Sequence, residues 1–161
     1  MNKTLWIMCG APGSGKSWFA KNKLMKDYGW DYISRDEVRF AVVKDDEKYF
    51  SHEKEVFREF VEKIAIALDW GHDNVIADAT HLNWGSRCKL LKALSKNCVL
   101  EDVDIIPVVV TANTKVIFER NQSREGRARV PEDVIKRMLR SMSDPEKDPY
   151  KYTAIMRVVN E

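Results

Sequence analysis

The sequence contains little cysteine, and this scarcity excludes two kinds of small protein. Its three cysteines, Cys9, Cys88 and Cys98, are an odd number and lack the spacing of metal-binding motifs. A small domain held together by disulfides would need a denser, even set of cysteines. We therefore expect free thiols in a reducing cytosol, and hence a cytoplasmic protein.

Long apolar runs and a large excess of one charge are also missing. No apolar run approaches the ~20 residues that a membrane-spanning helix needs, and the N-terminal apolar stretch lacks the pattern of a signal peptide. The 27 Lys and Arg residues and the 25 Asp and Glu residues give a formal net charge of +2. We expect no membrane association. The charge balance neither requires nor excludes a nucleic-acid partner, because a local basic patch matters more than the total.

Internal repeats, low-complexity tracts and linkers are likewise absent from the sequence. The hydrophobic content of 44% and the charged content of 32% are typical of a folded globular protein. A chain of 161 residues is long enough to bury a hydrophobic core and has the length of one ordinary domain. We expect a single domain over residues 1–161, and the sequence leaves its oligomeric state open.

What the sequence does contain is a glycine-rich stretch with the pattern Gly-x4-Gly-Lys-Ser, between an apolar run at residues 5–9 and a helical pattern at residues 17–25. Glycines permit a tight turn whose backbone N–H groups face anionic oxygens, and the helix N-terminus adds its own free N–H groups. Lys16 can reach the terminal phosphates, and the Ser17 hydroxyl can ligate Mg²⁺. We therefore expect ATP, or another nucleoside triphosphate, to be bound by Gly10, Ala11, Pro12, Gly13, Ser14, Gly15, Lys16 and Ser17.

Strand and helix patterns alternate along the chain. We expect strands near residues 5–9, 32–34, 74–78, 104–110 and 152–159. The helices between them include a long one that Ser51 can cap and Gly71 ends. This alternation predicts an α/β fold of the P-loop NTPase type, with three layers and a parallel sheet covered by helices on both faces. Pro107 is awkward inside a central strand, so we place it towards an edge or at a bulge.

Three polar segments fall just after predicted strands. In parallel sheets ligands bind beyond the carboxyl ends of the strands, so residues 10–17, 35–39 and 78–83 should gather at one edge. Asp78 could serve the metal through a bound water, or it could cap the following turn.

Asp36 could accept the proton of an incoming hydroxyl group. Arg39 lies three residues later on the same helical face, where it could orient Asp36 or hold a substrate phosphate. Simple surface pairing within residues 35–39 explains this spacing equally well.

Arginines surround a glycine in residues 120–129, between two helical patterns. Such a segment suits a mobile lid, about residues 122–131, that closes over the phosphates and supplies the cations that phosphate chemistry needs. A solvated basic loop is the alternative. We expect Arg120, Arg124 and Arg127 to contact the nucleotide.

His81 and three aromatic residues are weaker candidates. His81 could be a catalytic base, but its predicted place in a strand-to-helix turn favours a structural role. Phe40, Tyr49 and Trp84 lie near the expected acceptor side, where each could stack on a base or simply pack against the protein.

Four segments together resemble the kinase domain of phage and bacterial polynucleotide kinases. They are residues 10–17, 34–39, 76–83 and 120–131, which occur in the same order over nearly the whole chain. The resemblance implies transfer of the γ-phosphate of ATP, with Mg²⁺, to a 5′-hydroxyl end of DNA or RNA. It implies that Lys16 and Ser17 serve the phosphates and the metal. It further implies that Asp36 is the general base, that Arg39 contacts the acceptor's phosphate, and that Arg124 stabilises the transferring phosphate.

Two rival interpretations remain. Kinases of small metabolites, nucleotide sugars and aminoacyl-tRNA share the same layout, and the low net charge mildly favours them, because strong polynucleotide binding usually needs a basic surface. A nucleotide-binding switch without acceptor chemistry is the third possibility. The substitution Asp36→Asn separates them, because it should leave a switch intact but stop turnover in either kinase.

Overall fold

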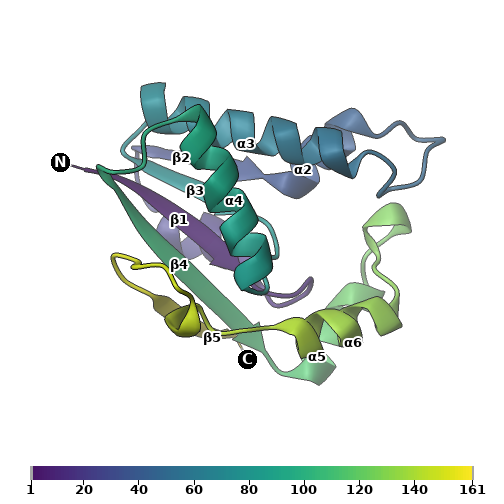
Figure 1. Ribbon diagram of the computed structural model, residues 1–161. Helices are drawn as coiled ribbons and strands as arrows, with labels where there is room; N and C mark the ends of the chain where they lie inside the picture. Colours follow the sequence, from purple (N-terminus) through teal and green to yellow (C-terminus); the bar gives the residue numbers. More distant parts are fainter. Residues whose placement is uncertain (1, 161) are drawn as a thin grey trace.

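The computed structural model describes residues 2–160, and for Arg127 it describes the backbone only. Five strands form one parallel sheet in the order β2-β3-β1-β4-β5 (Figure 1). The strands are β1 (Lys3–Cys9), β2 (Trp30–Ser34), β3 (Asn74–Asp78), β4 (Val103–Ala112) and β5 (Met156–Asn160). The α/β fold with a parallel sheet is therefore confirmed.

The helices cover both faces of the sheet. They are α1 (Lys16–Phe19), which continues as the π-helix η1 (Ala20–Leu24), α2 (Arg35–Val42), α3 (Glu53–Trp70), α4 (Trp84–Asn97), α5 (Thr114–Gln122) and α6 (Glu132–Ser141). Two short 3₁₀ turns, η2 (Gly126–Ala128) and η3 (Pro145–Lys147), lie after α5 and α6.

Alternating residues of the central strands divide the core into two layers. Leu5 and Ile7 of β1 pack with Phe60 of α3 and Leu90 of α4 on one face. Met8 lies in a separate cluster with Ala20 of η1 on the other face. Because neighbouring side chains of a strand point to opposite faces, both faces of this sheet are apolar and both are covered, which gives the expected three layers.

Two local predictions were wrong in detail. Ser51 does not cap α3: its hydroxyl donates to the carbonyl of Lys48 at 2.6 Å inside a turn, and the helix begins after His52. Strand β4 is not an edge strand, because β1 and β5 flank it. Pro107 is tolerated there because the pairing of β4 with β5 begins one residue later, at Val108.

Two other local predictions hold, the end of α3 and the free thiols. Gly71 ends α3, with its N–H bonded to the carbonyl of Ala67 at 2.8 Å. All three cysteines are free thiols. No helix within residues 2–160 has both the length and the apolar character needed to cross a membrane.

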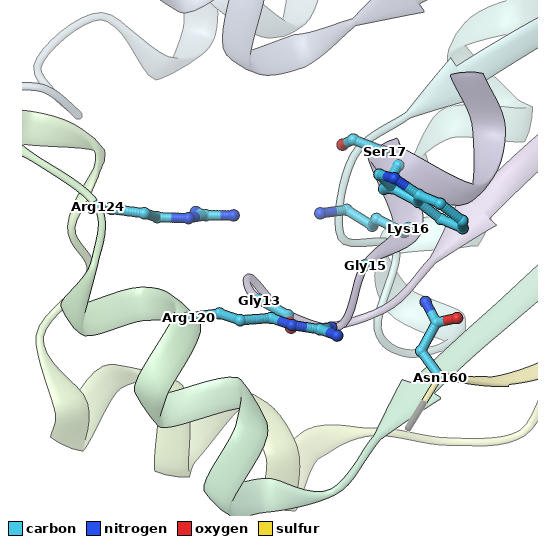
Figure 2. Close-up of a pocket in the computed structure, with 8 residues that line it drawn as sticks. Gly13, Gly15, Lys16, Ser17, Arg120, Arg124 and Asn160 are labelled. Carbon is cyan, nitrogen blue, oxygen red and sulfur yellow. The ribbon is translucent and has the colours of Figure 1, made fainter. Parts of the chain in front are cut away.

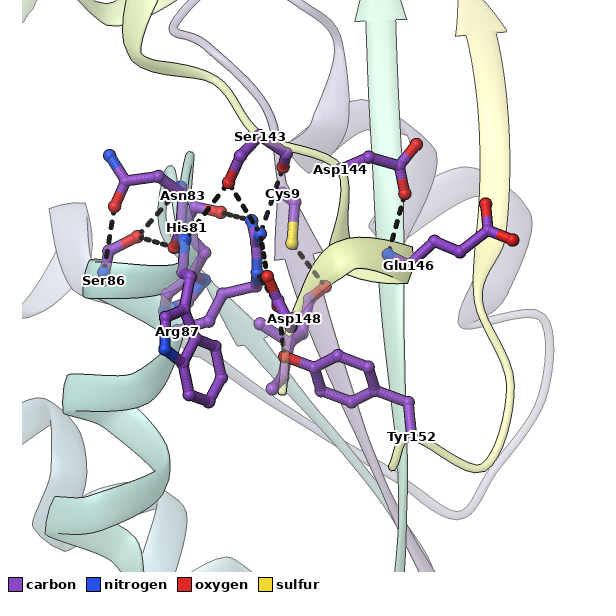
Figure 3. A network of polar contacts seen from close by, with 12 residues as sticks. Cys9, His81, Asn83, Ser86, Arg87, Ser143, Asp144, Glu146, Asp148 and Tyr152 are labelled. Atoms are coloured by element: carbon purple, nitrogen blue, oxygen red, sulfur yellow. Dashed lines mark hydrogen bonds and ion pairs between the residues drawn. The ribbon is translucent and has the colours of Figure 1, made fainter. Parts of the chain in front are cut away.

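A buried ion pair ties the segment between α6 and β5 to helix α4. Arg87 of α4 is fully buried and donates from Nε and Nη2 to the carboxylate of Asp148 at 2.7 and 2.9 Å. The same guanidinium donates to the carbonyls of His81 and Ser143 at 2.9 and 3.1 Å (Figure 3). The Tyr152 hydroxyl donates to Asp148 at 2.7 Å. Both charges are thus fully paired away from water.

We expect Asp148→Asn to lower the free energy of unfolding by about 3–5 kcal/mol, because it leaves the buried Arg87 charge without its counter-charge. Urea unfolding followed by circular dichroism measures this change. The matched control is Asp133→Asn, which removes the carboxylate of an exposed ion pair with Arg137 on α6. That control should stay within about 0.5 kcal/mol of the wild type. Equal losses in the two variants would contradict the importance given to the Arg87–Asp148 pair.

Candidate active site

The glycine-rich stretch forms the turn between β1 and α1. Gly13 and Gly15 have φ angles of 85° and 93°, in the left-handed region that side chains other than glycine rarely adopt. A Cβ atom on Gly15 would lie 2.3 Å from Nδ2 of Asn160. The backbone N–H of Gly10 donates to the carbonyl of Thr80 at 2.8 Å, which joins the turn to the segment after β3. Glycine therefore stands at the two positions of this turn whose backbone conformation other residues rarely adopt.

Two distant side chains brace the turn from outside. Arg120 of α5 donates from Nη1 to the carbonyl of Gly13 at 3.1 Å. Asn160 of β5 donates from Nδ2 to the carbonyl of Ser14 at 3.1 Å. Asn160 was not found from the sequence, because no local pattern marks a residue whose only signal is its position at the end of β5. The phosphate loop is therefore held by elements more than a hundred positions away.

A cavity of about 470 Å³ opens beside the loop. Its lining residues come from the loop, α1, α5, β5 and the segment that follows α5. They are Gly13, Gly15, Lys16, Ser17, Trp18, Arg120, Arg124 and Asn160. Figure 2 shows Lys16 and Arg124 pointing toward each other from opposite sides of this space. Two cations that converge on one space create a site for an anion such as the terminal phosphates of a nucleotide.

Ser17 and Asp78 lie side by side at the start of α1 and the end of β3. The Ser17 hydroxyl donates to Oδ2 of Asp78 at 2.6 Å, and the Tyr32 hydroxyl donates to the same oxygen. Burial raises the pKa of Tyr32, and the neighbouring Asp78 raises it further. The phenol therefore keeps its proton and acts as a donor.

These groups fit a magnesium ion better than a transition metal. Within residues 2–160 no cluster of three or more His, Cys, Asp and Glu side chains could enclose a metal. A hydroxyl that donates its proton to Asp78 still has lone pairs for a cation. One hydroxyl, one carboxylate and otherwise water and phosphate oxygens are the donors that Mg²⁺ commonly uses.

Asp36 stands at the beginning of α2, where Ser34 caps the helix by accepting a hydrogen bond from the N–H of Glu37 at 3.3 Å. Its carboxylate accepts from Nη1 of Arg39 at 2.6 Å and from the Tyr49 hydroxyl at 3.3 Å. The Asp36 side chain remains more than half exposed, at 58%. Arg39 thus contacts Asp36 directly, as expected both if it orients the carboxylate and if the two side chains simply pair at the surface.

Glu53, at the first position of α3, is a site residue that sequence analysis missed. It accepts from Nε and Nη2 of Arg39 at 2.7 and 3.0 Å, and from Nη2 of Arg35 at 3.0 Å. Partial burial raises the pKa of Glu53, but the hydrogen bonds and charges of the two arginines have the larger combined effect and hold its pKa below the usual value. Three of the five N–H groups of Arg39 therefore already donate to carboxylates.

A second cavity, of about 370 Å³, lies on the Asp36 side of the phosphate loop. Its polar lining includes Lys16, Arg35, Asp36, Arg39, Glu53, Asp78 and Arg124. Three aromatic rings also line it: Phe40 and Tyr49 have ring centres 5.3 Å apart, and Tyr49 and Phe50 4.9 Å. Phe40 and Phe50 are each about half exposed. Lys16 and Arg124 line both cavities, so the two spaces meet at these cations.

The structure brings most of the predicted site residues together. Of the loop residues, Gly13, Gly15 and Ser17 line the first cavity, Pro12 lines the second and Lys16 lines both, whereas Gly10, Ala11 and Ser14 line neither and are buried. The side chain of Arg127 lies outside the described part of the chain. Trp84, which was considered for base stacking, packs against the core of α3 and α4 instead.

His81 lies close by but lines neither cavity. It is 5% exposed, its Nδ1 lies 2.8 Å from the carbonyl of Met8, and its ring stacks on Phe60. Burial lowers the pKa of His81 to about 4. The ring is therefore neutral near pH 7 and donates to the Met8 carbonyl, as a structural histidine does.

One protein family and several solved structures are similar to this chain. The AAA domain family (AAA_33) matches residues 5–145. No curated protein has a matching sequence. A chain of the Pnkp1/Rnl/Hen1 RNA repair complex is 19% identical with a TM-score of 0.68 over 87% of this chain and 44% of that chain. The protein described here thus spans less than half the length of that relative.

Two further structures differ in what their names say they phosphorylate. A fungal RNA kinase is 14% identical, with a TM-score of 0.62 over 96% of this chain and 74% of that chain. A gluconokinase from Sinorhizobium meliloti 1021 is 17% identical, with a TM-score of 0.59 over 98% of this chain and 82% of that chain. At such low identities the likeness shows the fold alone, and the fold occurs with more than one acceptor.

The buried His81 gives a pH-dependent stability. The unfolded chain binds a proton at this histidine below its ordinary pKa of 6.5, whereas the folded chain binds it only near pH 4. The unfolded state thus holds more protons between these values, and the free energy of unfolding falls by up to about 3 kcal/mol as the pH drops through this window. We expect His81→Asn to lose this part of the pH dependence, measured by urea unfolding at several pH values.

The matched control is His72→Asn, the same substitution at a histidine whose side chain is 57% exposed. If His81→Asn keeps the wild-type slope between pH 4 and 6.5, His81 is not buried in its neutral form.

Proposed function

The chain belongs to the AAA domain family, and on that premise we propose that it is an ATP-dependent phosphotransferase that phosphorylates the 5′-hydroxyl end of DNA or RNA. The observation that carries the proposal is the pair of cavities that meet at Lys16 and Arg124. One cavity adjoins the phosphate loop, and the other contains the carboxylate of Asp36. A donor phosphate and an acceptor hydroxyl bound in the two cavities would meet between the two cations.

Each chemical requirement of phosphoryl transfer has a candidate residue. The loop N–H groups and Lys16 would hold the β- and γ-phosphates. Asp36, oriented by Arg39, would accept the proton of the attacking hydroxyl. Arg124 would reach the transferring phosphate from the opposite side. Ser17 and Asp78 would hold Mg²⁺, which when bound neutralises charge on the phosphate oxygens.

The aromatic rings of the second cavity support a nucleic-acid end as the acceptor. Phe40, Tyr49 and Phe50 form a wall beside Asp36. A base stacked on an aromatic side chain gains roughly 1–3 kcal/mol. A terminal nucleoside could therefore rest its base on this wall while its 5′-hydroxyl faces Asp36.

A small hydroxyl compound is the second candidate acceptor, and the charge of the same cavity favours it. Glu53 and Asp36 carry two negative charges that balance Arg35 and Arg39. A polynucleotide brings a chain of phosphates that usually calls for unpaired cations. The fold similarity to a gluconokinase fits this alternative.

We expect Asp36→Asn to lower the rate of phosphate transfer by about 10²–10⁴-fold while ATP binding is retained, because the substitution keeps the size of the side chain and removes its basicity. Transfer of labelled γ-phosphate from ATP, with Mg²⁺, to a 5′-hydroxyl oligonucleotide measures this. Asp102→Asn, at an exposed position before β4, is the matched control and should keep wild-type activity.

Labelled oligonucleotide from the wild type but not from Asp36→Asn supports both the acceptor and the base. If the wild type labels gluconate or another small hydroxyl compound and no oligonucleotide, the second candidate is correct. Wild-type transfer by Asp36→Asn would remove Asp36 from the mechanism.

We expect Arg124→Ala to lower kcat by about 10³-fold or more with a smaller change in KM for ATP, because a cation in this position acts mainly on the charge of the transition state. Steady-state kinetics of the same transfer reaction test this. The control is Arg137→Ala, which removes an exposed arginine of α6. If Arg124→Ala is fully active and Arg127→Ala is not, the catalytic cation of the lid is Arg127.

A further inference from the structure

Oδ2 of Asp78 accepts two hydroxyl hydrogen bonds, and only one of them belongs to the phosphate loop. Ser17 donates from α1 at 2.6 Å, and Tyr32 donates from β2. Asp78 itself is 3% exposed. A carboxylate so deeply buried keeps its orientation only through the groups that hydrogen-bond to it.

Packing fixes the position of the Tyr32 hydroxyl. Tyr32 lies beside Ile76 in the register of β2 and β3, two residues before the level of Asp78. Its ring packs against the apolar cluster between the sheet and η1. Nζ of Lys21 lies 5.1 Å from the ring centre. The strand and these neighbours hold the ring, so the hydroxyl has a defined direction toward Asp78.

We propose that Tyr32 is a positioning residue for the divalent cation: its hydroxyl holds the Asp78 carboxylate in place beside Ser17 and so sets the affinity of the site for Mg²⁺. The proposal rests on the proposed function in one respect, since it takes Ser17 and Asp78 to be the cation site of a phosphotransferase. It adds a residue that belongs neither to the glycine-rich loop nor to the lid.

The chemistry of the three side chains explains the effect. If the phenol is missing, Oδ2 loses one of its two donors and the buried carboxylate can turn about its side-chain bond. The Ser17 hydroxyl, which donates to the same oxygen, then loses a fixed partner. Groups that orient metal ligands by hydrogen-bonding to them typically lower metal affinity by about 10–100-fold when they are removed.

The test is the binding of Mn²⁺ in place of Mg²⁺ to the full chain with ADP present, followed by the electron paramagnetic resonance signal of free Mn²⁺. We expect Tyr32→Phe to weaken Mn²⁺ binding by about 10–100-fold. Tyr28→Phe makes the same chemical change at a fully exposed tyrosine and should match the wild type. ADP binding in the presence of EDTA should be equal in all three proteins, because the loop N–H groups are untouched.

A second measurement separates positioning from mere structural support. In a phosphate-transfer or ATPase assay, the Mg²⁺ concentration for half-maximal rate should rise by a similar factor in Tyr32→Phe, while the rate at saturating Mg²⁺ recovers. A purely structural tyrosine would lower the melting temperature and leave the Mn²⁺ affinity unchanged, which would overturn the proposal. The absence of Mn²⁺ binding by the wild type with ADP would overturn it as well.

The metal measurement does not depend on the acceptor. If Tyr32→Phe weakens Mn²⁺ binding and the wild type phosphorylates no oligonucleotide, the inference stands and the proposed acceptor is wrong. If oligonucleotides are phosphorylated and Tyr32→Phe binds Mn²⁺ as the wild type does, the acceptor stands and the inference is wrong.

Discussion

The ion pair between Arg87 and Asp148 is the interaction on which the geometry of the site depends. It fixes the segment that leaves α6 and enters β5, and Ser143 of the same segment donates its N–H to the carbonyl of Leu82 at 3.0 Å. Strand β5 follows this segment, and Asn160 at its end donates a hydrogen bond to the carbonyl of Ser14. The same segment begins where α6 ends. The buried charge pair therefore anchors the stretch that joins α6 to β5 and, through β5, the Asn160 brace of the phosphate loop.

The electrostatics of the site differ on its two sides. Around the phosphate loop, Lys16 and Arg124 face a common space (Figure 2). Around Asp36, each arginine has a carboxylate partner, because Glu53 binds both Arg35 and Arg39. Free positive charge is thus concentrated where a phosphate would be transferred, and the neighbouring cavity is close to neutral. This division suits a reaction in which the donor is a polyanion and the reacting group of the acceptor is an uncharged hydroxyl.

The sheet, the phosphate loop and the gathering of residues 10–17, 35–39 and 78–83 can be predicted from the sequence, because each has a local signal and the carboxyl ends of parallel strands share one edge. The contacts of Glu53, Asn160 and Tyr32 cannot, because their partners lie 14 to 146 positions away. The same limit explains two errors. Pro107 looked like an edge residue because strand order is not local, and Ser51 looked like a cap although its hydroxyl bonds within the preceding turn.

The acceptor is the hardest feature to derive for a physical reason. A base such as Asp36 and a cation such as Arg124 act on any hydroxyl and any phosphate, so they carry no information about the rest of the substrate. Selectivity must come from the wall of the second cavity, where Phe40, Tyr49 and Phe50 offer stacking and Glu53 cancels the charge of Arg39. A terminal base stacked on this wall suits both its aromatic rings and its cancelled charge. The base gains its binding energy from the rings and needs no extra cation at that point.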